Sequence, residues 1–554
     1  MSASPPLRVG LLLDDWTAPR WVEDIVRALL RSPAVHLALV IRTSPPGSAG
    51  RKGRLVNLWR MRRTWAFDAY RRLDARLFAC PDDPFAPRDL RPLLDDVPQL
   101  TVRPIRTSSS DRFADADLGE IAPRRLDVAL GLGSRTLRGA VLDIAPHGIW
   151  SFHQGNDAVG RRGPGGAWEV FENRPTTSAL LEVLTESPEP VRVLGRVSIA
   201  TDPRSVHRNR CALIERAWPM MPRLLESLQA TGRLVVEPAR LSGDPEHQGA
   251  PSSAQTAGGL VRLASRYVRD RVTRAVTSEQ WQLGYDLGAG CPEMSRFRAI
   301  EPPVDRFWAD PFPVESDDGH VVFFEELIYP ANGERPRGWI SSLRIGPAGE
   351  VGPVAKVLEA PHHLSYPLVF SWRNDWYMLP ESAEANNVVL YRSTRFPDAW
   401  ERCAVLLDDC AGLDNTLAEI DGSWWLWVTL KSRGPSPANE TMLFHAESPL
   451  GPFVAHPRNP VATDIRNARG AGRPFVHEGH WIRPAQDGSG SYGRAIVFMR
   501  IDQLDLDHYA ESEISRIEPR WDRGIVATHT YNRAGKLQMI DFVKRRFRLG
   551  WTAR

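Results

Sequence analysis

With 554 residues, 42% of them hydrophobic and 25% charged, the chain has an ordinary globular composition and room for two to four domains. Its 70 basic and 67 acidic residues leave a net charge of +3, which gives no reason to expect a nucleic acid partner. The five cysteines contain no Cys-x-x-Cys pair, so we expect neither a disulfide framework nor a metal site. They favour a reducing, cytoplasmic location, with peripheral membrane attachment left open. No apolar run of about 18 residues occurs, so no transmembrane segment is expected.

The N-terminal part shows the alternating strand and helix patterns of an open α/β sheet. A buried parallel strand is expected at Leu7–Leu13, a helix at Pro19–Leu30 and a second strand at His36–Arg42. Further strands are expected at residues 126–130, 148–152, 180–185 and 191–198. Ligands of such sheets bind at the carboxyl ends of the strands, where His153 falls. We therefore assign residues 1–230 to an α/β domain.

A histidine and a glycine-rich turn follow one of these strands. The segment reads Ile149-Trp-Ser-Phe-His-Gln-Gly-Asn156 and is followed by Arg162-Gly-Pro-Gly-Gly-Ala-Trp168. It resembles the formyltransferase fold that uses 10-formyltetrahydrofolate, whose chemistry rests on an Asn-x-His pair and a later Asp. By that resemblance His153 is a catalytic candidate, while Ser151 stands at the Asn position and Glu189 at the Asp position.

The two changed positions argue against that activity. Formyl transfer needs a base for the amine proton and donors for the oxyanion, and a Ser hydroxyl has a shorter reach than an Asn amide. Pro188 and Pro190 stiffen the loop that would have to adjust to Glu189. We therefore expect a degenerate formyltransferase-like domain, with 10-formyltetrahydrofolate as the cofactor that the resemblance alone would supply. The alternative is an active N-formyl or N-acyl transferase that acts on an amino sugar.

Residues 231–294 are expected to connect two domains. Ser242–Gly259 is rich in Gly, Ser, Pro, Ala and Gln and has no hydrophobic periodicity, which is typical of a linker. A short basic helix is expected after it, at Leu260–Ser278.

From about Phe307 the pattern changes to strands that recur with a period of roughly 50 residues. Each repeat opens with a short motif, continues as an apolar strand and a polar or glycine turn, and ends in an aromatic strand. The openings are Trp308–Val314, Ser365–Phe370, Asp414–Ile420, Gly472–His477 and, in degenerate form, Tyr492–Phe498. Residues 295–545 are therefore predicted to form an all-β five-bladed propeller, with a pair of stacked sandwiches as the alternative.

In a propeller the first strand of each blade lines a central channel, so the opening motifs would place polar side chains in one pocket. Acids and amides bind sugar hydroxyls and aromatic rings stack on sugars, so we expect a sugar, nucleotide-sugar or lipid-linked sugar as ligand. The residues expected there are Asp310, Tyr366, Asp414 and Arg473, with Glu381, Arg483, Gln486, Asp487, His529 and Asn532 behind them.

The motif Trp308-Ala-Asp-Pro-Phe312 resembles the first-blade motif of the five-bladed glycosidases of family 43. By that resemblance Asp310 is a catalytic base or nucleophile, and Glu381 and Asp414 are candidates for the general acid and its pKa-setting partner. The plainer alternative is that Asp310 starts a strand with an Asx turn.

Several further motifs narrow the resemblance: His363-Leu-Ser-Tyr-Pro367, Leu379-Pro-Glu-Ser382, Arg483-Pro-Ala-Gln-Asp487 and His529-Thr-Tyr-Asn532. Together they are similar to the N-terminal propeller of plant glucosamine inositolphosphorylceramide transferases and to bacterial proteins that fuse it to a formyltransferase-like domain. That fusion leads us to expect a bacterial protein. The plant family is understood to transfer the sugar with a separate C-terminal domain.

We therefore expect a carbohydrate-directed enzyme of glycan or glycolipid biosynthesis or processing, a transferase or a glycosidase-like protein, with a sugar-binding propeller. A non-catalytic glycan-binding protein is the third hypothesis, beside the active N-formyl transferase. Loss of the carboxylates at Asp310 and Glu381 would leave such a binder largely intact, whereas a hydrolase would lose its rate.

Overall fold

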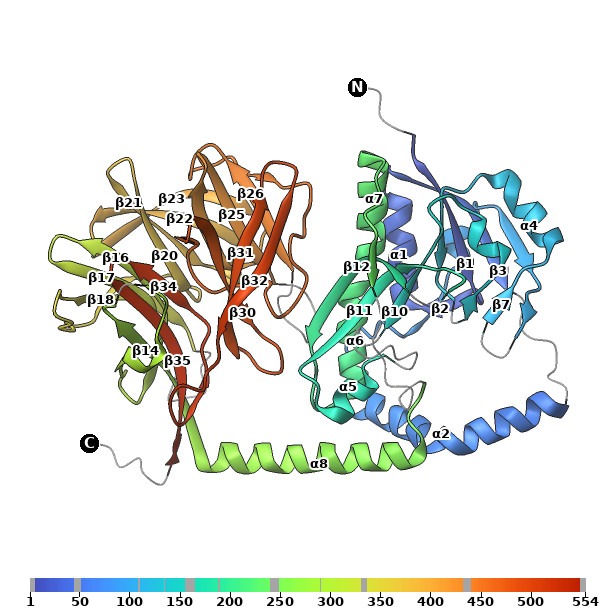
Figure 1. Ribbon diagram of the computed structural model, residues 1–554, viewed down its shortest axis with the longest axis horizontal. Coiled ribbons are helices and arrows are strands. Elements are labelled where there is room, and N and C mark those ends of the chain that lie inside the picture. The colour runs from blue at the N-terminus through green and yellow to red at the C-terminus, as the bar shows by residue number, and fades with distance from the viewer. Residues whose placement is uncertain are drawn as a thin grey trace. The chain divides into compact units, whose positions relative to one another are not determined.

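The computed structural model describes residues 5–43, 51–107, 110–133, 135–154, 165–187, 190–239, 249–288, 290–329, 336–431 and 440–548. Contacts between Cα atoms divide the chain into two compact units, Met1–Tyr267 and Val268–Arg554 (Figure 1). The boundary falls inside helix α8 (Ser253–Val276), so each unit is described by itself. No described helix is both long and apolar enough to cross a bilayer.

The N-terminal unit is built on an eight-stranded sheet with strand order β13-β12-β11-β10-β8-β1-β3-β5. The strands are β1 (Leu7–Leu13), β3 (Val35–Thr43), β5 (Gln99–Val102), β8 (Val128–Gly131), β10 (Ile149–Gln154), β11 (Thr176–Val183), β12 (Val191–Ala200) and β13 (Glu237–Ala239). The five strands from β10 to β5 pair in parallel, and β11, β12 and β13 continue the sheet antiparallel. The strand pattern of the sequence thus corresponds to an open α/β sheet.

Alternate residues of the strands face two separate hydrophobic cores, because successive side chains of a strand point to opposite faces. Leu11 packs with α1 (Arg20–Arg31), α6 (Val206–Ala217) and α7 (Met220–Thr231). Leu12 packs on the other face with α4 (Asp115–Ile121). The other elements are the long helix α2 (Arg51–Leu77) and the short elements α3 (Arg91–Leu94), α5 (Ala167–Glu172), β2 (Thr17–Pro19), β4 (Pro87–Asp89), β6 (Ile105–Arg106), β7 (Ser110–Arg112) and β9 (Thr136–Leu137).

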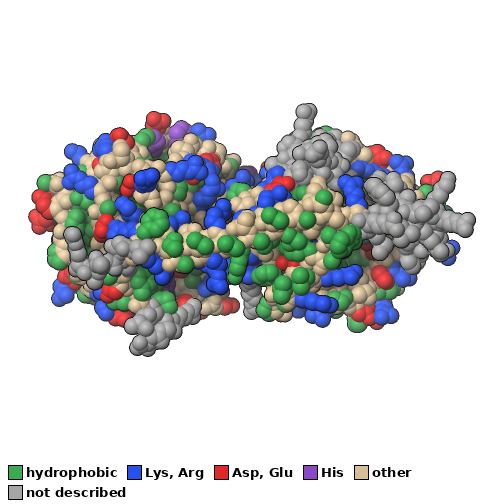
Figure 2. All heavy atoms as spheres, turned by 90° about the horizontal axis from the view of Figure 1, so that it is seen from below, with side chains coloured by type: hydrophobic (Ala, Val, Ile, Leu, Met, Phe, Trp, Pro, Cys, Tyr) green, Lys and Arg blue, Asp and Glu red, His purple; other side chains and the backbone are tan. Residues whose placement is uncertain are grey.

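Helix α8 begins earlier than the sequence pattern indicated, at Ser253 instead of Leu260. Its first turns pack on α5: a Cβ at Gly259 would lie 2.5 Å from the Phe171 ring, and Arg262 donates to the Phe171 carbonyl at 3.0 Å. Glycine therefore allows a close approach here and does not mark a linker. Figure 2 shows exposed apolar side chains gathered along this helix, and they include Val261, Val268 and Val272.

The C-terminal unit consists of five successive antiparallel sheets. The first three contain β16 (Arg306–Ser316), β17 (Gly319–Ile328), β18 (Gly338–Ile345) and β19 (Ala355–Leu358); β20 (Ser365–Trp372), β21 (Asp375–Glu381), β22 (Asn387–Arg395) and β23 (Ala399–Asp408); and β24 (Gly412–Ile420), β25 (Ser423–Leu430), β26 (Thr441–Ala446) and β27 (Val454–Ala455). The fourth contains β28 (Arg469–Gly470), β29 (Phe475–His477), β30 (His480–Asp487), β31 (Ala495–Leu504) and β32 (Tyr509–Ile517).

The fifth sheet joins the beginning and the end of this unit. Its strands are β14 (Thr277–Asp286), β15 (Arg298–Ile300), β33 (Ile525–Ala527), β34 (Tyr531–Ala534) and β35 (Leu537–Phe547), and β14 pairs with β35 along its whole length. The sequence placed Thr277–Asp286 in the connecting segment and began a fifth repeat at Tyr492. Instead, Ala495–Leu504 completes the fourth sheet, because it pairs with β30.

Candidate functional site

Three non-glycine residues with left-handed backbone occupy matching positions in three consecutive sheets. Asp310 in β16, Tyr366 in β20 and Asp414 in β24 have φ angles of 52°, 47° and 46°. The pairing of each strand with its neighbour is interrupted at this residue. Such bulges redirect a side chain, and left-handed backbone in residues other than glycine concentrates at functional sites. The repeat therefore forms the same bulge, with a left-handed residue in it, in three sheets.

The second strand of each of these sheets carries a buried polar residue beside the bulge. The residue before each left-handed position pairs with it across the sheet, as Ala309 with Glu325, Ser365 with Glu381, and Leu413 with Thr429. Glu325, Glu381 and Thr429 are all buried. In two of the three repeats the second strand thus adds a carboxyl group to the cluster.

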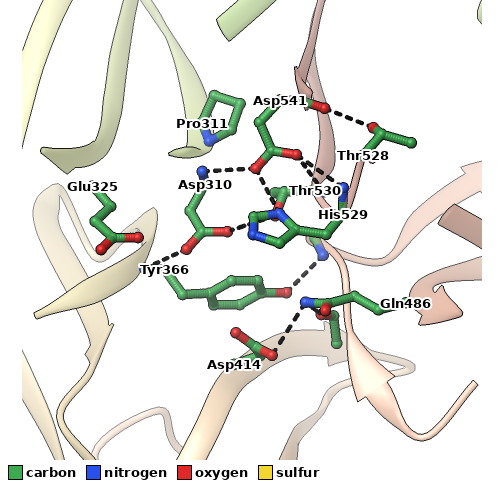
Figure 3. Close-up of polar contacts among 12 residues, drawn as sticks. Asp310, Pro311, Glu325, Tyr366, Asp414, Gln486, Thr528, His529, Thr530 and Asp541 are labelled. Carbon is green, nitrogen blue, oxygen red and sulfur yellow. Dashed lines mark hydrogen bonds and ion pairs between the residues drawn. The ribbon is translucent and has the colours of Figure 1, made fainter. Parts of the chain in front are cut away.

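Hydrogen bonds from the left-handed residues connect neighbouring sheets (Figure 3). The Asp310 N–H donates to the Asp541 carboxylate at 2.9 Å, and the Tyr366 N–H donates to the Asp310 carboxylate at 3.2 Å. In the same way the Asp414 N–H donates to the Glu381 carboxylate at 3.0 Å. The carboxylates of Asp541, Asp310 and Glu381 therefore hold the strained backbone of the three left-handed residues in place.

The fifth sheet contributes His529, Thr530 and Asp541 to the cluster. The His529 Nδ1 lies 2.7 Å from the Asp541 carboxylate and 3.7 Å from that of Asp310, and the Thr530 hydroxyl donates to Asp310 at 2.6 Å. Burial opposes the charged imidazolium, but Asp541 and Asp310 raise the pKa of His529 overall. The imidazole also stacks on the Trp281 ring at 4.0 Å.

Cationic and amide groups surround Asp414. The Arg469 guanidinium is hydrogen-bonded to the Asp414 carboxylate and lies 3.9 Å from that of Glu381, and the Gln486 amide donates to Asp414 at 3.2 Å. Arg469 also lies over the ring of Tyr492 at 5.0 Å. Because the Tyr492 side chain is 54% exposed, an aromatic face stands between solvent and this arginine.

Tyr366 stabilises the cluster through the hydrogen bonds of its phenol hydroxyl. Its hydroxyl lies 3.0 Å from the Thr416 Oγ1 and accepts a hydrogen bond from the Gly472 N–H at 2.6 Å. The side chain is fully buried. Tyr366 therefore contributes positioning through both its backbone and its phenol.

Burial and mutual repulsion separate the pKa values of these acids. Burial raises the pKa of Asp310 to about 6, with His529 opposing the rise and Asp541 and Asp414 adding to it. Burial and the neighbouring Asp414 raise the pKa of Glu381 to about 8, and burial raises that of Glu325 well above its ordinary value. Near neutral pH the cluster therefore holds a protonated Glu381 beside a mainly ionised Asp310, which is the division of roles that general acid and base catalysis uses.

One edge of the cluster also has a donor set suited to a cation. Carboxylate oxygens of Asp310 and Asp541 and a ring nitrogen of His529 lie within 4.8 Å of one another. Two carboxylates and an imidazole are ordinary ligands of divalent metals. The same residues are already joined by the contacts described above, so they are also satisfied without an ion.

We expect the stability of this unit to fall as pH rises from about 4.5 to 8. Folding raises the pKa of Asp310 from 3.8 to about 6 and that of Glu381 from 4.5 to about 8, so the folded state binds more protons in this range. Stability from such groups is complete below the unfolded pKa and is lost as pH passes the folded value. Urea unfolding at a series of pH values measures it. Glu381→Gln should flatten the slope, while Glu419→Gln, an exposed acid on β24, should not; equal slopes in all three proteins would contradict the assignment.

Three residues predicted to bind substrate lie outside the cluster. Arg483 is paired with Glu511 at 2.6 Å, and Asp487 accepts from Arg516 at 3.2 Å, on the opposite face of β30 from Gln486. Arg473 binds the Val369 carbonyl. Side chains alternate along a strand, so Gln486 reaches the cluster and its odd-numbered neighbours do not.

Asn532 lies beside the cluster and its side chain binds the backbone of two other residues. Its amide donates to the Pro311 carbonyl at 2.9 Å, and its side-chain oxygen accepts from the Arg473 N–H at 2.7 Å. It therefore secures the residue that follows Asp310.

The positions of the formyltransferase motif are only partly described. Ser151 and His153 both lie in β10, paired with Glu182 and Leu180, and the Ser151 hydroxyl donates to the Gly131 carbonyl at 3.2 Å. Glu189 lies outside the described residues. Because the hydroxyl that would replace the family's amide is bound to a backbone carbonyl, the described residues do not fit transfer from 10-formyltetrahydrofolate.

The sequence reasoning did not predict several members of the site: Glu325, Thr530, Asp541, Arg469, Tyr492 and Trp281. Glu325 carries the clearest signal, because it follows Asp310 at the same interval as Glu381 follows Tyr366. Asp541 and Trp281 lie in strands that the sequence left out of the repeat, and they meet only because β14 pairs with β35.

Residues 300–540 match the sequence model of a family described as glucosamine inositolphosphorylceramide transferase 1, N-terminal. The rice (Oryza sativa subsp. japonica) protein of that name is 36% identical over 213 residues, which are 38% of this chain and 28% of the rice protein. The match thus spans little more than a quarter of the length of this relative.

Two solved structures align with parts of the chain at low sequence identity. A family 117 glycoside hydrolase from Zobellia galactanivorans aligns with a TM-score of 0.32 and 13% identity, over 48% of this chain and 90% of its own. Glycinamide ribonucleotide transformylase 1 from Symbiobacterium toebii aligns with a TM-score of 0.28 and 16% identity, over 42% of this chain and 95% of its own.

Two predictions are corrected by the sequence comparison. The expectation of a bacterial protein was wrong, because the matching relatives are plant proteins from rice and Arabidopsis thaliana. The prediction of a cytoplasmic location was also wrong. Those relatives are named for transfer to inositolphosphorylceramide, a membrane lipid, and five free cysteines do not define a compartment.

Proposed function

We propose that this protein is a carbohydrate-directed enzyme of glycan or glycolipid biosynthesis or processing and that the acidic cluster of its C-terminal unit is the reactive site. One observation carries the proposal: the carboxyl groups of Asp310, Glu381 and Asp414 are buried in one cluster, where burial and mutual repulsion raise the pKa values of Asp310 and Glu381. The family match of residues 300–540 supports a sugar as the substrate.

Glu381, protonated at neutral pH, is the proposed general acid, and Asp310 is the proposed base or nucleophile. Burial and repulsion from the Asp414 carboxylate raise the pKa of Glu381 and so keep it protonated. Arg469 acts in the opposite direction and lowers that pKa. The proposed ligand contacts are Gln486 and His529, with the exposed ring of Tyr492 available to stack on a sugar. The substrate class is a sugar, a nucleotide-sugar or a lipid-linked sugar.

We also propose that the five sheets of the C-terminal unit are the blades of a propeller, over residues 295–545 together with β14, and that residues 1–230 form a formyltransferase-like domain. The closing pair of β14 and β35 supports the first assignment, since such closure is how a ring of sheets avoids free edges. The parallel core of the eight-stranded sheet supports the second.

Turnover of p-nitrophenyl glucosaminide and of a glucosamine-bearing inositolphosphorylceramide by the full-length protein tests the proposed function. A bell-shaped dependence of kcat/KM on pH, with limbs near the pKa values of about 6 and about 8, is the expected result. Absence of turnover with both substrates and with a nucleotide-sugar donor would contradict it.

A non-catalytic glycan-binding protein is the second candidate, favoured by a different observation. The side chains of Asp310, Glu381 and Asp414 are only 7%, 10% and 3% exposed, and each accepts hydrogen bonds from the protein. Such acids can serve to hold the strained backbone alone. Calorimetry that detects sugar binding without any turnover would favour this candidate.

We expect no turnover of 10-formyltetrahydrofolate with amino sugars, because the Ser151 hydroxyl is bound to the Gly131 carbonyl and offers no amide donor for an oxyanion. Release of tetrahydrofolate, followed by absorbance, is the measurement. Clear turnover that disappears in His153→Ala but persists in His147→Ala would show that the N-terminal site is active.

A further inference from the structure

Four metal-ligand side chains meet in the N-terminal unit, far from the acidic cluster in sequence. Cys80 and Asp83 lie in the segment that follows α2, and His207 and Cys211 lie on α6. His207 and Cys211 are four residues apart, so they project from the same face of that helix. The two pairs are separated by more than a hundred residues, which is why the search for a Cys-x-x-Cys pair could not find them.

The distances among His207, Asp83 and Cys211 lie in the range of a tetrahedral site. The His207 Nε2 lies 3.6 Å from the Asp83 Oδ2 and 3.6 Å from the Cys211 Sγ, and the Cys211 Sγ lies 3.8 Å from the Asp83 Oδ1. The ligand atoms of Cys80, His207 and Cys211 lie within 4.8 Å of one another. Ligands at ordinary zinc bond lengths in a tetrahedron are separated by about 3.4–3.8 Å.

The neighbours of Asp83 hold it in a ligating position. Its Oδ1 accepts the Phe85 N–H at 2.8 Å, and its carbonyl accepts the Arg20 Nε–H at 3.3 Å. The other oxygen, Oδ2, is the one nearest the imidazole. Such outer hydrogen bonds orient the ligands of metal sites. Cys211 is buried, and the His207 side chain is 10% exposed, so the ligands project into a largely enclosed space.

We propose that Cys80, Asp83, His207 and Cys211 bind a structural zinc ion that fastens the segment after α2 to α6. Thiolate, imidazole and carboxylate are the ligand types that zinc prefers, and four protein ligands leave no open position for catalysis. The proposal is independent of the function proposed for the acidic cluster, which lies in the other unit.

The first test measures metal directly on the full-length chain. After expression with added zinc and dialysis, elemental analysis should find close to one zinc ion per chain. Cobalt substituted for zinc should show the absorption of a tetrahedral thiolate site. Wild-type protein that binds neither metal on titration would overturn the proposal, as would a Cys80–Cys211 disulfide in the metal-free protein purified without reductant.

Variants separate ligation from packing. Cys80→Ser and Asp83→Asn replace partly exposed side chains and should fold, yet weaken zinc affinity by about tenfold or more. Cys403→Ser, at an exposed cysteine, is the matched control and should retain wild-type affinity. A chelator should lower the thermal transition of the wild-type N-terminal unit and leave that of Cys80→Ser unchanged. Unchanged zinc affinity in both ligand variants would overturn the assignment.

Discussion

Asp310→Asn is expected to lower kcat for glycoside turnover by about 10²- to 10⁴-fold, the range that a general base or nucleophile contributes. The Asn Oδ1 can still accept from the Tyr366 N–H, and its Nδ2 can donate to the Thr530 hydroxyl, so the strained backbone keeps its partners. Sugar binding, measured by calorimetry, should therefore fall only modestly. The comparison of kcat with binding separates a reacting group from a group that merely binds.

Asp375→Asn is the matched control, since Asp375 is an exposed acid at the start of β21. It should leave turnover and binding unchanged. Full activity in Asp310→Asn would contradict the catalytic role of Asp310. Circular dichroism and a thermal scan of each variant show whether a loss of rate reflects loss of the fold.

Glu511→Ala is expected to destabilise the C-terminal unit by about 3–5 kcal/mol, because it leaves the Arg483 guanidinium buried without its counter-charge. The side chains of Arg483 and Glu511 are 2% and 7% exposed, and they meet at 2.6 Å and 2.8 Å through two nitrogens of the guanidinium. Urea unfolding followed by Trp fluorescence provides the measurement. Glu401→Ala, which breaks an exposed pair with Arg392, should change little.

The double variant Arg483→Met with Glu511→Leu should recover most of the lost stability, since removal of both charges also removes the unpaired one. Arg483 was predicted to bind substrate, and this experiment separates the two roles. If Arg483→Met raised KM while stability stayed unchanged, a binding role would stand and the structural role would be contradicted.

The sequence predicted much of the acidic cluster because residues at matching positions of its repeat adopt the same backbone geometry. Asp310, Tyr366 and Asp414 open their strands at matching places, and the structure gives all three the same left-handed backbone. The motifs did not predict which side chains of a strand face the cluster, because successive side chains alternate between the two faces of a sheet. Arg483 and Asp487 share a motif with Gln486, but only Gln486 faces the cluster, because neighbouring residues of β30 face opposite sides of the sheet.

Long-range pairing explains the other omissions. Neither Trp281 nor Asp541 lies in a recognisable repeat. Asp541 approaches His529 because β33 and β34 pair with β35, and Trp281 approaches it because β14 pairs with β35. The pair Cys80 and Asp83 meets the pair His207 and Cys211 only because the segment after α2 packs on α6. No local pattern encodes such contacts, since they depend on which distant segments a chain brings together.

The closing strand of the C-terminal unit has a consequence for synthesis. Asp541 lies on β35, which pairs with β14 and so joins the last part of this unit to the first. A ribosome-bound chain that has not yet released β35 lacks both the acceptor for the Asp310 N–H and the partner of His529. The acidic cluster therefore cannot assemble sheet by sheet during synthesis. It is complete only after translation has passed β35.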